Sequence, residues 1–164
     1  MGIIGVGSNA LGASSLELAE QELKAFLKER CITDKETTQL YGKDFSFHEG
    51  KVPDVVCYPN DIQEIKKIVD ICANYSIPII PFGSGTSLEG HINATKGGVC
   101  IVFANMSKVL SIQAQDFTVT VQPGITYDEL NKQLKEYGLF FSPDPGPGAS
   151  VGGMVGKKKS ILFF

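Results

Sequence analysis

Apolar residues near the start of the chain recur at intervals of three and four, the spacing of one face of an α-helix. The residues of this face are Leu16, Ala19, Leu23, Phe26 and Leu27. Ser14 and Glu17 precede them as a capping box, so we expect a helix over residues 15–29 that forms an N-terminal appendage. The pattern then breaks up into polar and aromatic residues, which predicts an irregular connection up to residue 51.

Short apolar runs alternate with one amphipathic segment between residues 52 and 104. Residues 55–58, 79–80 and 99–103 are uninterrupted apolar runs next to Pro or Gly, as expected of buried strands. Asn60 with Gln63 predicts the start of a helix. Its apolar face would consist of Ile62, Ile65, Ile68, Val69 and Cys72. A helix between such strands indicates a small parallel sheet covered by helices.

The pattern changes after residue 105. Residues 110–113 and 118–122 are short and rich in β-branched residues, which predicts an antiparallel hairpin. Thr126 and Glu129 form a capping box for a helix that ends at Gly138, and residues 139–141 would form a last strand. We therefore predict an α+β fold with lobes at about 52–104 and 105–155, preceded by residues 1–51 and followed by a tail at 156–164.

The composition is that of a globular protein. Of 164 residues, 43% are hydrophobic and 20% are charged, and the net charge of −3 argues against a nucleic-acid-binding surface. No apolar run reaches the roughly 18 residues of a membrane helix, and the start of the chain does not resemble a transit peptide. Cysteines stand at positions 31, 57, 72 and 100, too far apart in sequence for a zinc knuckle or a redox dithiol, so we expect buried thiols.

A glycine-rich stretch, PFGSGTSLEGH at residues 81–91, follows one of the expected strands. Closely spaced glycines beside hydroxyl groups turn several N–H groups towards one point, which is the geometry of an anion nest. A dinucleotide fingerprint counted from Gly83 would need glycine where Leu88 stands, and a P-loop counted from Gly85 would need lysine where His91 stands. We expect a phosphate-binding loop of another kind, with a tight solvent turn as the alternative.

A second stretch, SPDPGPGASVGGM at residues 142–154, alternates proline with small residues. Such a backbone is stiff and can lie close against a flat ligand without interference from side chains. An interdomain linker would explain the same composition.

Four stretches taken together resemble a known family. They are PFGSGTSLEGHINA at 81–94, GGVCIVFANMSKVLSI at 97–112, VTVQPGITYDELNKQL at 119–134 and GLFFSPDPGPGASVGGM at 138–154. They resemble the FAD-binding domain of the vanillyl-alcohol oxidase and p-cresol methylhydroxylase (PCMH) superfamily, in particular the cytochrome-linked D-lactate dehydrogenases with their glycolate oxidase and D-2-hydroxyglutarate dehydrogenase relatives. The resemblance covers residues 52–155.

The resemblance implies a cofactor site made by both glycine-rich stretches. The first would wrap the FAD pyrophosphate, and the second would approach the flavin. The implied cofactor-binding residues are Pro81, Phe82, Gly83, Ser84, Gly85, Thr86, Ser87, Asp144, Gly148, Ala149, Ser150, Gly152 and Gly153. Relatives that attach flavin covalently from this loop have a histidine where Thr86 stands, so we expect non-covalent FAD.

The resemblance also implies a reaction, hydride transfer from a D-2-hydroxy acid such as D-lactate to FAD, with an electron acceptor such as cytochrome c. It implies a mitochondrial location, with the cytoplasm as the alternative. The family's catalytic and metal-binding residues lie in a later cap domain, and His48 and His91 make no case for a metal pair, so we expect neither kind of residue here. The alternatives are a non-catalytic nucleotide- or phosphate-binding module and an interaction protein that uses an exposed half-sheet.

The similarity to the family stops after Met154, where the chain continues as VGKKKSILFF. We expect a truncated domain that does not turn over D-lactate by itself. For the tail we expect a disordered end, with a basic and apolar membrane-surface anchor as the alternative.

Overall fold

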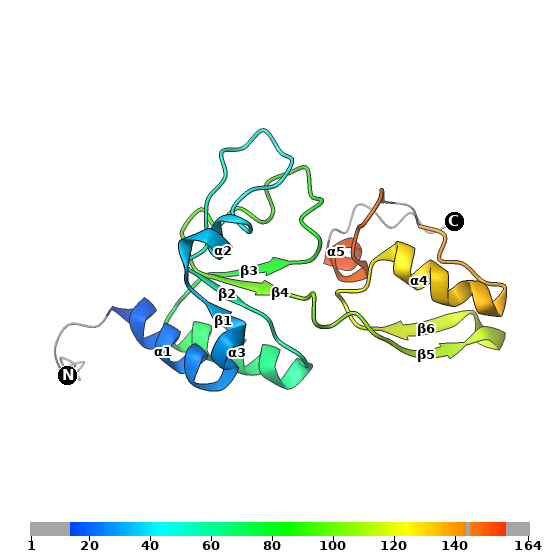
Figure 1. The fold of residues 1–164 in the computed structure, drawn as a ribbon, viewed down its shortest axis with the longest axis horizontal. Helices are drawn as coiled ribbons and strands as arrows, with labels where there is room; N and C mark the ends of the chain where they lie inside the picture. The colour runs from blue at the N-terminus through cyan, green and yellow to red at the C-terminus, as the bar shows by residue number, and fades with distance from the viewer. Residues whose placement is uncertain (1–13, 144, 157–164) are drawn as a thin grey trace, which may run out of the picture.

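The computed structural model describes residues 14–143 and 145–156, which form two lobes (Figure 1). The first lobe contains α1 (Ser15–Leu27), η1 (Lys28–Arg30), β1 (Cys31–Ile32), α2 (Lys35–Gln39), β2 (Val55–Cys57), α3 (Ile62–Asn74), β3 (Ile79–Phe82) and β4 (Val99–Val102). The second contains β5 (Val109–Gln113), η2 (Ala114–Asp116), β6 (Thr118–Val121), α4 (Tyr127–Leu134), η3 (Lys135–Tyr137) and α5 (Val151–Gly156). The predicted α+β class is confirmed. Of the expected tail at 156–164, Gly156 is the last residue of α5, and residues 157–164 lie outside the described residues.

The sheet of the first lobe has the strand order β1-β2-β4-β3. Both β2 and β3 pair in parallel with β4, as the apolar runs predict. The prediction of an irregular connection between residues 31 and 51 is partly wrong, because this segment contains α2 and the edge strand β1, which pairs antiparallel with β2. Two residues of strand are too few for periodicity to reveal, and only pairing with β2 makes them a strand.

Helix α1 is part of the core of the first lobe and not an appendage. Ala19, Leu23 and Leu27 are buried against α3, where they pack with Ile68 and Cys72. Figure 1 shows α1 and α3 on the same side of the sheet. Helical periodicity predicts that α1 has an apolar face but not which partner covers it, so the prediction of an appendage is wrong.

The start of α3 differs from the prediction by one residue. Asp61 caps the helix, since its Oδ1 accepts hydrogen bonds from the N–H groups of Gln63 and Glu64 at 2.9 Å each. The N–H of Asn60 instead donates to Glu64 Oε2 at 2.7 Å. Glu64 also pairs with Arg30 through both guanidinium nitrogens at 2.5 and 2.6 Å, which joins α3 to the end of η1.

The predicted hairpin and its following helix are confirmed in the second lobe, as β5, β6 and α4. The last predicted strand, residues 139–141, is not formed among the described residues. Both backbone groups of Phe141 instead bond to the side chain of Asn131 in α4. The Phe141 N–H donates to Asn131 Oδ1 at 2.6 Å, and the Phe141 carbonyl accepts from Asn131 Nδ2 at 3.3 Å. The end of the second glycine-rich stretch is helical as α5.

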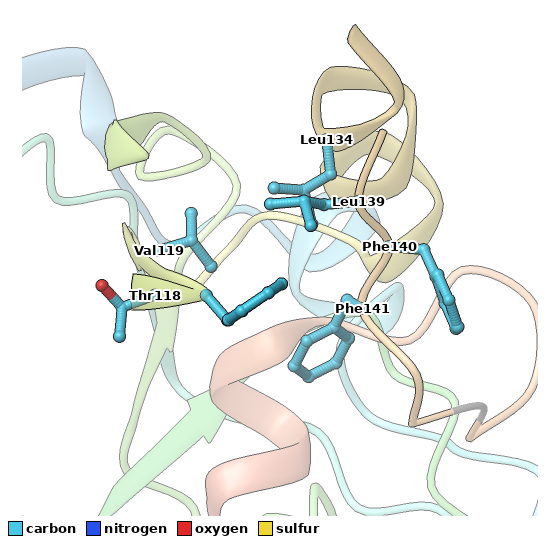
Figure 2. Close-up of a pocket in the computed structure, with 7 residues that line it drawn as sticks. Thr118, Val119, Leu134, Leu139, Phe140 and Phe141 are labelled. Carbon is cyan, nitrogen blue, oxygen red and sulfur yellow. The ribbon is translucent and has the colours of Figure 1, made fainter. Parts of the chain in front are cut away.

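Apolar side chains remain uncovered on the second lobe. Figure 2 shows a cavity of about 90 Å³ between the start of β6, α4 and residues 139–141, with Val119, Leu134 and Phe141 in its wall. Phe117 and Phe140 also line the cavity, and they are 81% and 76% exposed. This cavity belongs to the second lobe alone and contains no residue of the glycine-rich stretches.

Candidate functional site: two loops that meet between the lobes

The first glycine-rich loop begins where β3 ends and lies at the surface. Among the described residues, none accepts a hydrogen bond from the backbone N–H groups of residues 83–87. Ser84 and Thr86 are exposed. Gly85 has φ +68°, and a Cβ there would lie 2.7 Å from the Phe82 ring, so both backbone conformation and space favour glycine. The loop therefore offers several unpaired donors to an external acceptor, as expected of an anion nest.

A distant segment supports the far end of this loop. The N–H of Gly90 donates to Asp44 Oδ2 at 2.8 Å, and a Cβ at Gly90 would lie 2.8 Å from the His48 ring. Burial acts to raise the pKa of Asp44, but the hydrogen bonds from Ser46 and Gly90 outweigh it and lower this pKa below its ordinary value. Asp44 is therefore held as a buried carboxylate that fixes Gly90.

The hydroxyl of Ser87 is already engaged inside the loop. It lies 2.8 Å from His91 Nδ1 and also accepts a hydrogen bond from the N–H of Glu89 at 3.4 Å. His48, beside Gly90, and His91, beside Ser87, thus both lie near the end of this loop. No group of three or more potential metal-binding side chains occurs among the described residues.

The second glycine-rich stretch is tied to the start of α4. Gly148 donates from its N–H to Asp128 Oδ2 at 2.9 Å, and Gly152 donates to the Pro123 carbonyl at 2.8 Å. A Cβ at Gly152 would lie 2.7 Å from the side chain of Pro123. These bonds hold the stretch against the start of α4, so it is not a free linker.

The two glycine-rich stretches meet at Gly83. A Cβ placed on Gly83 would lie 2.2 Å from Ser150 Oγ and 3.9 Å from the Gly153 nitrogen. Ser150 is 4% exposed, and its Oγ accepts a hydrogen bond from the Gly153 N–H at 3.3 Å. Figure 1 shows α5 beside the ends of β3 and β4. The fold thus brings one loop from each lobe into contact.

The remaining expected residues occupy different environments. Pro81 and Phe82 belong to β3, and Phe82 packs edge-on against Tyr41 with ring centroids 4.7 Å apart. Ala149 is buried, whereas Gly153 is exposed. Asp144 lies outside the described residues. The structure therefore brings Gly83 together with Ser150 and Gly153, while Phe82 faces the sheet core.

Three residues near the site have no signal in the local sequence pattern. Asp44 and His48 come from the segment expected to be irregular, and they reach the loop only through the tertiary fold. Asn93 lies beside Gly90 and borders a cavity of about 210 Å³ along β3. Its Oδ1 is buried and finds no hydrogen-bond donor among the described residues.

The Asp44 contact leads to a testable expectation. Asp44→Asn replaces an acceptor with an amide donor facing the N–H group of Ser46 or Gly90, so we expect about 1–3 kcal/mol lower stability at neutral pH. Since folding lowers the pKa of Asp44, its contribution is present above the ordinary pKa and is lost as pH falls below about 4. Urea unfolding should therefore show a shallower acid decline for Asp44→Asn than for the parent chain.

The exposed Asp116 provides the control for this experiment. Asp116→Asn should leave the free energy of unfolding within about 0.5 kcal/mol of that of the parent chain. An equal effect of the two substitutions would show that the Gly90 contact does not hold the loop.

Comparisons with known proteins agree with this geometry. A family model of the FAD binding domain matches residues 53–160. The chain is 46% identical over 141 residues to "D-lactate dehydrogenase [cytochrome], mitochondrial" from Arabidopsis thaliana, a match that covers 85% of this chain and 25% of that protein. No helix within the described residues has the length and apolar character needed to cross a membrane.

Two solved structures share the fold. An alkyldihydroxyacetonephosphate synthase matches with a TM-score of 0.76 and 28% identity, over 84% of this chain and 30% of that one. A p-cresol methylhydroxylase with substrate bound matches with a TM-score of 0.73 and 22% identity, over 88% of this chain and 29% of that one. Unpaired backbone N–H groups such as those after β3 are donors of the kind that bind phosphate groups. The chain therefore belongs to the FAD binding domain family, with FAD as its cofactor and a PCMH-type fold.

Proposed function

We propose that residues 83–87 hold the pyrophosphate of FAD. The observation that carries this proposal is the run of N–H groups after β3 with no acceptor among the described residues. Ser84 and Thr86 add exposed hydroxyl groups to these donors. Ser87 would contribute mainly through its N–H, since its hydroxyl already contacts His91.

The second stretch would bound the flavin side of the cofactor. Gly153 is its exposed glycine next to Gly83, whereas Ala149 and Ser150 are buried and would act by positioning the loop. Gly148 and Gly152 would hold the stretch against the second lobe through Asp128 and Pro123. Asp144, within the same stretch, completes the proposed set of residues.

The whole protein would be an FAD-dependent dehydrogenase of D-2-hydroxy acids. This rests on the similarity to the Arabidopsis thaliana D-lactate dehydrogenase, of which the chain spans about a quarter. Bound FAD would accept a hydride from the α-carbon of the substrate. The residues of this chain would bind and orient the cofactor, while a cytochrome would accept the electrons in the mitochondrion.

Titration of the chain with FAD, followed by quenching of flavin fluorescence, tests the cofactor site. We expect ADP to compete with FAD, because the first loop would hold the phosphates, and riboflavin not to compete. Binding of FAD without competition from ADP would contradict the assignment of the loop. Binding of ADP without any of FAD would instead favour the non-catalytic nucleotide-binding module.

Anaerobic bleaching of the flavin absorbance tests the activity, in a full-length protein that contains this domain. D-Lactate should bleach the band and L-lactate should not. Bleaching by neither acid would contradict the proposed substrate class without affecting the cofactor site.

We further expect FAD to be bound non-covalently. Thr86 stands where covalent relatives have histidine, and a threonine hydroxyl donates a hydrogen bond to phosphate but supplies no ring nitrogen for attachment. Acid precipitation should therefore release essentially all the flavin into the supernatant. Yellow colour that stays in the washed pellet would contradict this expectation.

A further inference from the structure

Two cysteines that are 26 positions apart in sequence lie opposite each other in the sheet. Cys31 of β1 and Cys57 of β2 are direct partners in the antiparallel register. The N–H of Tyr58 donates to the Arg30 carbonyl at 3.0 Å, which makes Arg30 and Tyr58 a hydrogen-bonded pair. Since such pairs alternate along an antiparallel ladder, Cys31 and Cys57 form a non-hydrogen-bonded pair, with Cα atoms about 4.5 Å apart and side chains on one face.

This geometry matches that of a disulfide, which usually joins Cα atoms separated by about 4.4–6.8 Å. Both thiols are free and belong to the same apolar cluster, with Cys31 5% exposed and Cys57 fully buried. We propose that Cys31 and Cys57 are a thiol pair that small disulfides oxidise to a cross-strand disulfide joining β1 to β2.

The environments of the two thiols shift their pKa values in opposite directions, so one of them ionises before the other. The neighbouring Cys57 thiol lowers the pKa of Cys31, and the nearby Lys24 ammonium lowers it further against the effects of burial and of Glu20. The same neighbourhood and burial raise the pKa of Cys57. Cys31 is thus the attacking thiolate. Burial raises the pKa of Cys72 to about 11 and of Cys100 to about 12, so neither competes with Cys31 as the first attacking thiol.

The reaction balances through thiol–disulfide exchange with glutathione disulfide. The Cys31 thiolate attacks one sulfur of the oxidant, forming a mixed disulfide and releasing one glutathione thiolate. The Cys57 sulfur then attacks the Cys31 sulfur, forms the intramolecular bond and releases the second glutathione. The two protons lost by the cysteines go to the two glutathione thiolates, so the pair is oxidised and the glutathione disulfide is reduced.

The disulfide would enclose a segment that supports the first glycine-rich loop. Between Cys31 and Cys57 lie α2, Asp44 and His48, and the last two contact Gly90. Because closing this ring restricts the unfolded chain, the oxidised protein should unfold at a higher denaturant concentration than the reduced protein.

Peptide mapping tests the proposal, because the four cysteines fall on separate tryptic peptides, residues 31–35, 52–66, 68–96 and 97–108. The folded chain is incubated with glutathione disulfide, alkylated under denaturing conditions and digested. We expect peptides 31–35 and 52–66 to appear as one linked species about 2 Da lighter than the sum of the reduced pair. The chain with Cys72→Ala and Cys100→Ala should form the same link.

Cys31→Ala should abolish the link while leaving peptides 68–96 and 97–108 alkylated. Retention of all four alkylated thiols in the folded parent chain would overturn the proposal. So would a link through Cys72 or Cys100, or a glutathione adduct on Cys31 that does not resolve. These outcomes come from the parent chain, so the result does not depend on whether Cys31→Ala folds.

Discussion

Gly83→Ala should weaken FAD binding by about ten-fold or more, a loss of about 1.4 kcal/mol. The new Cβ would lie 2.2 Å from Ser150 Oγ, so the buried serine side chain must rotate and give up its hydrogen bond from the Gly153 N–H. Either that bond breaks or the two loops move apart. In both cases the N–H groups of residues 83–87 no longer face the second glycine-rich stretch. Fluorescence titration with FAD measures the change.

Adding Ser150→Ala to the Gly83→Ala chain tests whether the weaker FAD binding comes from the steric clash or from another effect of losing the glycine. It removes the clashing oxygen and leaves only the serine Cβ at 3.4 Å from the new methyl group, an ordinary contact. Because Ser150→Ala itself removes the hydrogen bond from the Gly153 N–H, the double variant should bind FAD about as tightly as Ser150→Ala alone, which a double-mutant cycle quantifies. Gly156→Ala is the matched control, since no atom lies within 4 Å of a Cβ there. Equal losses for Gly83→Ala and Gly156→Ala would contradict the proposed meeting of the loops.

Leu23→Ala should destabilise the chain by about 3 kcal/mol, within the range of about 2–5 kcal/mol for truncation of a buried leucine. Leu23 is fully buried in the cluster shared by α1, α3 and the sheet. Removing its isobutyl group loses apolar burial and leaves a cavity that the packed helices do not refill. Urea unfolding followed by circular dichroism gives the free energy of unfolding.

Leu40→Ala makes the same substitution at a position that is 71% exposed, so we expect a change below about 0.5 kcal/mol. A small effect at both positions would mean that α1 behaves as the separate appendage expected from its sequence. A large effect at Leu23 alone would confirm that residues before 52 belong to the first lobe.

Local patterns predicted most of the elements because each pattern reports on residues close in sequence. The apolar runs predicted β2, β3 and β4, and the capping box at Ser14 with Glu17 predicted the start of α1. The same reasoning failed at residues 139–141. The backbone of Phe141 is satisfied by the Asn131 side chain, and a run of apolar residues does not show which partner its backbone will take.

The sequence by itself determined the α+β class, the two glycine-rich stretches and, through the resemblance of four stretches to known proteins, the FAD-binding family. Tertiary structure alone decided that Gly83 meets Ser150, that Asp44 holds Gly90 and that Cys31 faces Cys57. The residues of each pair are 26 to 67 positions apart in sequence. Periodicity and turn chemistry act over a few residues, whereas such contacts depend on strand register and helix packing, which only the folded chain determines.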